Sequence, residues 1–533
     1  MKKFIIFCLS AFTLFGCKKY LDRDPKAFLS PSTYVTDSVT AGALLNGVYN
    51  AVDGYTDGFA KMTPYYLDLA SDNCMSNAPW QYFTVFPQSQ ASPLNTYVQL
   101  RWNMDYTGVS RANYFLSQLA ANPSFTQDIY KRLSAEAKFL RAYFYHDLVT
   151  YWGDVPLILT VSDISAKPAK DDKAKVIAQV LKDLNEAIPG LPTSYSGSNV
   201  GRVTKGAALA LKARVLLFNK QWAEAAATAK TCMDLNAYSL YPNYFNLFKQ
   251  DYKDNVTNTE AIFQVFYTPS TNPSTANNLI DWPQSYQPTL QLVNDYYMAN
   301  GYPITDTRSH YDPNNPFIGR DPRFAASIWY PGSHFKYAPW NADHIFGNAT
   351  ELWSTGFKCR KFINESISAA NEATGQAMNK VFIRYAEVLL TYAEAQNEAV
   401  GPDASVYSII DAIRTRAGMT TLSVAMPGLS QSGMRNEIRH ERRIELAFEG
   451  LRWNDIQRWQ IGPQTIVDAK GLDKNYLDYK QYPGDGNGVV PGVWEYRPIT
   501  VDTRMFNPDK DYLWPIPQTE LDANKNMMQN PTY

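Results

Sequence analysis

One stretch of the sequence, residues 437–459, constrains the fold more than any other. It reads EIRHERRIELAFEGLRWNDIQRW and carries apolar residues at the spacing of one helical face. This apolar stripe consists of Ile444, Ala447, Phe448 and Leu451. Most of the other positions are charged, with both signs, and the two Trp residues add large apolar area. We therefore predict a long amphipathic helix that bends or ends near Gly450 and continues as a shorter one, packed inside a large body.

The charges of this stretch have a regular spacing. Opposite charges three positions apart can pair along the surface of a helix. The sequence offers three such pairs: Arg442 with Glu445, Glu449 with Arg452, and Arg452 with Asp455. We expect these pairs to hold the buried helix.

His440 and Glu441 begin like the zinc-binding helix of metalloproteases. That helix needs a second His four positions after the first, and Ile444 stands there instead. The other four His residues and the cysteines beyond residue 17 show no metal-ligand spacing. We therefore predict no metal site and no cofactor.

The N-terminus has the pattern of a targeting segment. Lys2 and Lys3 precede a short apolar run, which ends in Leu-Phe-Gly-Cys at Cys17. The run is too short to span a membrane as a helix. Residues 1–16 are predicted to be a signal peptide, and the Cys box resembles that of bacterial lipoproteins. Cys17 is then the lipidation site, and the polar residues 17–30 form a tether.

Composition excludes some classes of function. The formal net charge is −1, with no long run of like charge, so the chain lacks the basic surface that nucleic-acid binding needs. The sequence contains no nucleophile-elbow, Walker or dinucleotide-binding motif. Aromatic residues make up 14% of the chain, and such rings fill cores or form platforms for ligands with an apolar face.

Helical pairs recur along the chain. Residues 205–220 and 222–235 form one pair rich in Ala where two helices must approach, and residues 381–399 and 403–417 form a second. Their length is near the ~34-residue period of tetratricopeptide repeats. A further helix is expected over 134–152, with Ser134 as its N-cap.

Between these helices lie long loop-rich insertions. Residues 254–375 and 462–505 are rich in Pro, Gly, Asn and aromatics, and only residues 261–267 suggest a short strand. The predicted fold is mainly α: a scaffold of tetratricopeptide-like helical pairs with loop-rich insertions that carry the ligand site, and few short strands.

Several blocks of the sequence together resemble the SusD/RagB family. They are the lipoprotein box, EAKFLRAYFY followed by WGDVPL in residues 136–157, RHERRIELAFEGLRWNDIQRW at 439–459, and YLWPIPQTEL at 512–521. Thr532 departs from the pattern, which has Gly there. The resemblance implies residues 31–258 and 259–533 as the two parts of one compact unit.

The resemblance also implies a function. Members of this family are outer-membrane, cell-surface lipoproteins that bind glycans or other nutrients. They deliver them to a partner SusC-like TonB-dependent transporter and do not act as enzymes. The expected partners are therefore a glycan, such a transporter and, through the lipid anchor, the outer membrane.

The loop aromatics indicate where a glycan would bind. A sugar ring has an apolar C–H face and a polar rim, which suits an aromatic ring beside amide or carboxylate groups. Tryptophans outside the predicted helices, with their polar neighbours, are the candidates. The predicted ligand-binding residues are Asp72, Asn73, Trp80, Tyr82, Trp282, Tyr286, Trp329 and Trp340.

Two other functions stay open at this point. A surface glycosidase needs only two carboxylates, and two of Asp72, Asp281 and Asp295 could form such a pair. A helical-repeat scaffold protein of the outer membrane also fits the interrupted repeats and the lipidation, although it has no evident use for tryptophans in loops.

Overall fold

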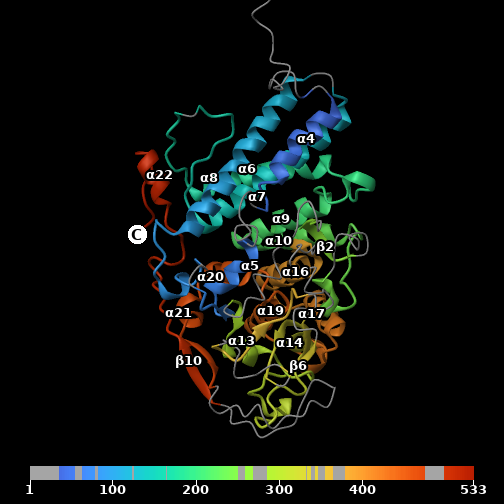
Figure 1. Ribbon diagram of the computed structural model, residues 1–533. Coiled ribbons are helices and arrows are strands. Elements are labelled where there is room, and N and C mark those ends of the chain that lie inside the picture. Colours follow the sequence, from blue (N-terminus) through green and yellow to red (C-terminus); the bar gives the residue numbers. More distant parts are fainter. Residues whose placement is uncertain are drawn as a thin grey trace, which may run out of the picture.

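The fold is mainly helical, with short two-stranded sheets, as the sequence predicts (Figure 1). The computed structural model describes residue 35 and residues 37–53, 63–78, 82–122, 125–163, 165–249, 258–267, 285–331, 333–337, 342–345, 354–363, 379–473 and 497–533. Within these ranges, no helix combines the length and the apolar character needed to cross a membrane.

Long helices build the upper half of the molecule in Figure 1. They are α4 (Ser38–Tyr49), α6 (Thr96–Ala121), α7 (Gln127–Trp152), α8 (Lys173–Ala187), α9 (Lys205–Phe218) and α10 (Trp222–Met233). Helix α7 begins earlier than predicted. Its N-cap is Thr126, whose hydroxyl accepts a hydrogen bond from the Ile129 amide at 3.4 Å, and Ser134 lies inside the helix.

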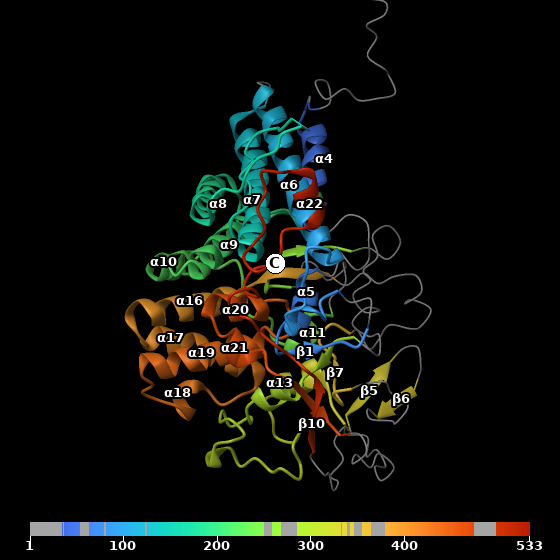
Figure 2. The same ribbon diagram turned by 90° about the vertical axis from the view of Figure 1, so that its left-hand side faces the viewer.

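A second group of helices builds the lower half, stacked below α10 in Figure 2. It contains α16 (Tyr385–Val400), α17 (Ala404–Ala417), α19 (Gln431–Glu445) and α20 (Arg452–Trp459). Both predicted helical pairs are present, α9 with α10 and α16 with α17, and α10 packs on α16 to join the two halves. One buried apolar cluster includes side chains from Val35 to Met527.

Short elements complete the fold. The strands pair antiparallel: β1 (Cys74–Met75) with β3 (Gln287–Pro288), β2 (Ala261–Val265) with β8 (Lys380–Arg384), β4 (Ile328–Trp329) with β7 (Lys358–Cys359), β5 (His334–Tyr337) with β6 (Ala342–Ile345), and β9 (Ala469–Leu472) with β10 (Pro498–Asp502). The short helices are α5 (Thr63–Tyr66), α11 (Tyr244–Leu247), α13 (Leu290–Asp295), α14 (Pro322–Ser327), α18 (Leu422–Ala425), α21 (Gly462–Thr465) and α22 (Gln518–Ala523). The 3-10 turns are η3 (Leu67–Ala70), η4 (Phe86–Gln88), η5 (Ile188–Gly190), η6 (Gly197–Asn199) and η8 (Thr307–Ser309).

The predicted long helix at 437–459 is shorter than expected at its C-terminal end. Helix α19 ends at Glu445, and a turn with Phe448 at φ +68° and Gly450 at φ +77° leads into α20. The turn places the Phe448 ring in the core and lets the Gly450 amide donate to Asp68 Oδ2 at 2.6 Å. Ile444, Ala447 and Phe448 of the apolar stripe are therefore buried and Leu451 is half-buried, but the last residues of the stripe are not helical.

The charges predicted to pair along this helix pair with other elements instead, which corrects the three predicted pairs. Arg442 contacts Asp455 at 3.2 Å, and Glu445 is bound by three Arg side chains. These are Arg323, Arg384 and Arg416. The three-residue spacing identified the charges correctly, but burial brings partners from other elements into reach.

Candidate functional site

Two of the predicted site residues, Asp72 and Asn73, lie inside the protein. Asp72 forms ion pairs with Arg443 at 2.9 Å and Arg452 at 2.8 Å. Burial opposes the ionisation of Asp72, but these two guanidiniums outweigh it and lower its pKa to about 2. Asn73 is fully buried, where it donates to Asp68 at 2.6 Å and accepts from Arg443 at 3.0 Å. Both side chains hold the α19–α20 region in place.

The aromatic candidates divide into buried, exposed and undescribed positions. Trp329 in β4 is 1% exposed, and Tyr286 is fully buried beside Tyr66, so neither offers a free ring face to a ligand in this structure. Tyr82 is 42% exposed and stays a prediction. The remaining candidates, Trp80, Trp282 and Trp340, lie outside the described residues and also stay predictions.

The positions of Asp72 and Asp295 around Arg443 test part of the glycosidase alternative. This side chain ion-pairs with both Asp72 and Asp295, so two of the three candidate carboxylates do come together. A glycosidase needs one carboxylic acid with a raised pKa to protonate the leaving group. The pKa of Asp72 is shifted in the opposite direction, so Asp72 does not suit that role. Asp281 lies outside the described residues.

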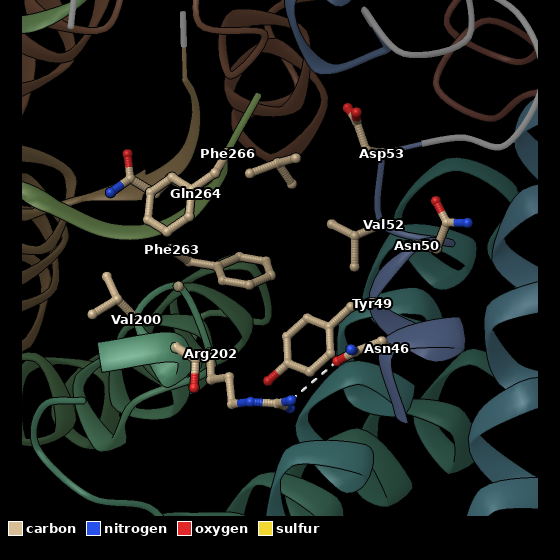
Figure 3. Close-up of a pocket in the computed structure, with 13 residues that line it drawn as sticks. Asn46, Tyr49, Asn50, Val52, Asp53, Val200, Arg202, Phe263, Gln264 and Phe266 are labelled. Atoms are coloured by element: carbon tan, nitrogen blue, oxygen red, sulfur yellow. Dashed lines mark hydrogen bonds between the residues drawn. The ribbon is translucent and has the colours of Figure 1, made fainter. Parts of the chain in front are cut away.

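A pocket of about 350 Å³ opens between three segments (Figure 3). They are the C-terminal end of α4 with the residues that follow it, the loop before α9, and β2 with Phe266. Its apolar surface comes from rings and its polar surface from amides and two charged groups. The main lining side chains are Asn46, Tyr49, Asn50, Asp53, Arg202, Phe263, Gln264 and Phe266.

A glycine positions the most accessible of the pocket's phenylalanine rings. Gly201 has φ +95°, and a Cβ atom at this residue would lie 2.4 Å from the Phe266 ring. Only glycine tolerates both the backbone angle and the close approach. The Phe266 ring therefore packs directly on the backbone of Gly201 and is half-buried where it lines the pocket.

A buried carboxylate orders the other wall. Glu136 of α7 accepts from the Tyr49 hydroxyl at 2.8 Å and from Arg202 Nη1 at 3.1 Å. Burial, together with the Glu136 charge, raises the pKa of Tyr49 well above its ordinary value, so the hydroxyl stays protonated and donates. Arg202 Nη2 also donates to Asn46 Oδ1 at 3.1 Å, the bond drawn in Figure 3.

The remaining charge in the pocket is also paired. Asp53 accepts from Lys380 Nζ at 2.5 Å and from the Tyr267 hydroxyl. Arg202 and Asp53 are thus each neutralised by a buried partner, and the amides Asn50 and Gln264 complete the polar lining. In the described part of the chain, no group of three His, Cys, Asp or Glu residues could hold a metal ion. The pocket suits an uncharged ligand that has an apolar face and hydrogen-bonding groups at its edge.

Sequence reasoning missed this pocket because its residues are far apart along the chain. The short strand at 261–267 was predicted, and its phenylalanines were the available signal. Nothing in the sequence indicates that Gly201 and Arg202 lie opposite Tyr49, because a buried Glu136 on a third helix sets that arrangement.

Comparison with known proteins identifies the family. Residues 246–533 match the family model described as "SusD family", and residues 19–217 match one described as "Starch-binding associating with outer membrane". The SusD-like protein P2 of Formosa agariphila is 27% identical over 560 residues, covering 99% of each chain.

Two solved structures from Bacteroides fragilis have the same fold. A SusD-like protein is 25% identical with a TM-score of 0.78, over 96% of this chain and 100% of that one. A SusD-like carbohydrate binding protein is 26% identical with a TM-score of 0.76, over 93% of this chain and 100% of that one. With a family model covering more than half of its length, the present chain belongs to the SusD family.

Proposed function

We propose that the protein binds a carbohydrate at the pocket of Figure 3 and delivers it to a SusC-like TonB-dependent outer-membrane transporter for nutrient uptake. The observation that carries the binding proposal is the half-buried Phe266 ring in a pocket that is also lined by the uncharged amides of Asn50 and Gln264. A ring face covers the C–H face of a sugar, and amides match its hydroxyl groups. The names of the related proteins, which include carbohydrate and starch binding, support the same class of ligand.

The binding proposal predicts the effect of Phe266→Ala. Loss of one stacking contact is expected to cost ~1–3 kcal/mol, on the scale known for base–aromatic stacking, or ~5- to ~150-fold in affinity. Calorimetric titration with maltohexaose, laminarihexaose, cellohexaose and xylohexaose is the measurement. The same incubations should leave the length of the sugar chains unchanged, because a binder creates no new reducing ends.

Phe245→Ala is a matched control. Phe245 is also a half-buried phenylalanine, but it packs under Lys249 and Arg360, away from the pocket. The Phe245→Ala variant should bind the hexasaccharides with the affinity of the unmodified protein. Equal affinities of the Phe266→Ala and Phe245→Ala variants would place the ligand elsewhere, with the loop candidates Trp80, Tyr82, Trp282 and Trp340 next in order.

The location and partner are parts of the same proposal. Cys17, which lies outside the described residues, would carry the lipid anchor at the cell surface. In mild-detergent extracts of outer membranes, the unmodified protein is expected to co-purify with a TonB-dependent barrel, whereas Cys17→Ser should appear in the soluble fraction. Retention of Cys17→Ser in the membrane would contradict the anchor, and recovery of the unmodified protein as a lone monomer would contradict the partner.

A further inference from the structure

A second and larger cavity lies on the other side of α6. It has a volume of about 790 Å³, within the ~300–1,000 Å³ usual for small-molecule sites. It shares no lining residue with the pocket of Figure 3. One wall is α6, and the opposite wall, the strap, is formed by residues 156–163 and 165–168, which follow α7 and lead toward α22 on the left in Figure 1.

Hydrogen bonds fix the strap at its beginning. The Tyr106 hydroxyl donates to the Pro156 carbonyl at 3.0 Å. The Ile158 backbone is bonded on both sides by the Tyr145 hydroxyl, at 2.6 and 2.9 Å, and its carbonyl also accepts from Asn113 at 2.8 Å. The cavity wall is therefore tied to α6 and α7.

The other end of the strap is fixed to the C-terminal segment. Asn524 donates to the Pro168 carbonyl at 2.8 Å and Asn526 to the Lys167 carbonyl at 2.7 Å. Glu520 of α22 lines the cavity at this end. Because both ends are bonded to other elements, the cavity is pre-formed, which lowers the ordering cost of binding.

The lining has the chemistry of a sugar site. The half-buried Tyr106 ring lines it, backed by the buried Trp102 ring 4.8 Å away, and Pro156 and Ile158 also line it. The exposed rim consists of hydroxyl and amide groups: Asn103, Thr107, Ser110, Thr160 and Ser162. Arg111 and Glu520 contribute one charge of each sign, so the cavity carries no net charge from its lining.

We propose that this cavity is a second saccharide-binding site, separate from the first pocket, which holds part of a neutral sugar chain. The inference rests on the proposed function, since it assumes the same class of ligand. Two sites on one molecule would raise the effective concentration of a long sugar chain at the protein, so that binding at one site favours binding at the other.

Filling the cavity from its rim tests the proposal. Thr107 is exposed on α6, and Thr107→Trp would place an indole into the cavity without disturbing the core. Ser117→Trp is the matched control: Ser117 is also exposed on α6 and also bonds back to its own helix, but it does not line the cavity. Ser110→Trp fills the cavity from a neighbouring rim position, should Thr107→Trp fail to fold.

The measurement is calorimetric titration with the hexasaccharide that the unmodified protein binds, repeated in the Phe266→Ala background. The unmodified protein is expected to bind more than one equivalent of a short fragment of that sugar. In the Phe266→Ala background, Thr107→Trp should remove one equivalent of binding and leave only the weakened binding at the first pocket, and Ser117→Trp should leave both unchanged. Equal binding by these two tryptophan variants overturns the second site while the effect of Phe266 still supports the first. If the unmodified protein binds none of the four hexasaccharides, both proposals fall.

Discussion

Replacing Glu445 with Gln is expected to lower the free energy of unfolding by about 3–5 kcal/mol, the usual cost of breaking a buried ion pair. Glu445 is fully buried and binds Arg384 at 2.6 Å, Arg323 at 2.9 Å and also Arg416. Burial alone would raise the pKa of Glu445, but the three guanidiniums hold it well below its ordinary value. A neutral amide leaves these cations without their shared partner. Urea unfolding followed by circular dichroism measures the loss.

Glu186→Gln provides the comparison for this substitution. Glu186 pairs with Lys138 and Lys182 on the surface, where its side chain is 38% exposed. Exposed pairs contribute only ~0–1 kcal/mol. If the Glu445 and Glu186 variants unfold at the same urea concentration, the buried network does not stabilise the fold in the way described.

Trp514→Ala is expected to cost about 3–5 kcal/mol, as large-to-small changes of buried aromatics do. The Trp514 ring is fully buried and stacks on Tyr151 with centroids 4.3 Å apart. It also meets the edges of Trp152 and Tyr97 at 5.4 and 5.6 Å. Removing it opens a cavity where the C-terminal segment joins α7, and thermal unfolding should occur at a lower temperature.

Trp222→Ala is the control, because it shows how much stability is lost when a less buried tryptophan is removed. Trp222 starts α10 and is half-buried at the surface, so less packing is lost. A melting temperature for Trp514→Ala equal to that of Trp222→Ala would show that the C-terminal segment contributes little to the cooperative core.

The helical scaffold could be predicted because its signal is local. Helices α9 and α10 are rich in buried Ala, and both end within two residues of their predicted ends. The predicted start of α16 was less accurate. Residues 381–384 belong to β8, because β-branched and aromatic side chains there pair with β2 instead of extending the helix.

The partners of the buried charges and the pocket residues could not be predicted, because they depend on contacts between distant segments. The sequence marks Asp72 as a polar residue in a loop, which is equally compatible with a ligand site and with an ion pair. Only the positions of Arg443 and Arg452 decide between them. In the same way, Trp329 lies in a Pro- and Gly-rich stretch, yet its short pairing with β7 places it in the core.

The ion pairs around Glu445 also imply an order of folding events as the chain is made. Arg323, Arg384 and Arg416 all precede α19 in the sequence, and the carboxylates before α19 that contact them are Asp321 and Glu260. The three cations therefore lack their later acidic partners, Glu441, Glu445 and Glu449, until α19 and the turn after it have been made. Until then the lower half of the molecule cannot close over them, so it completes its folding only when most of the chain is available.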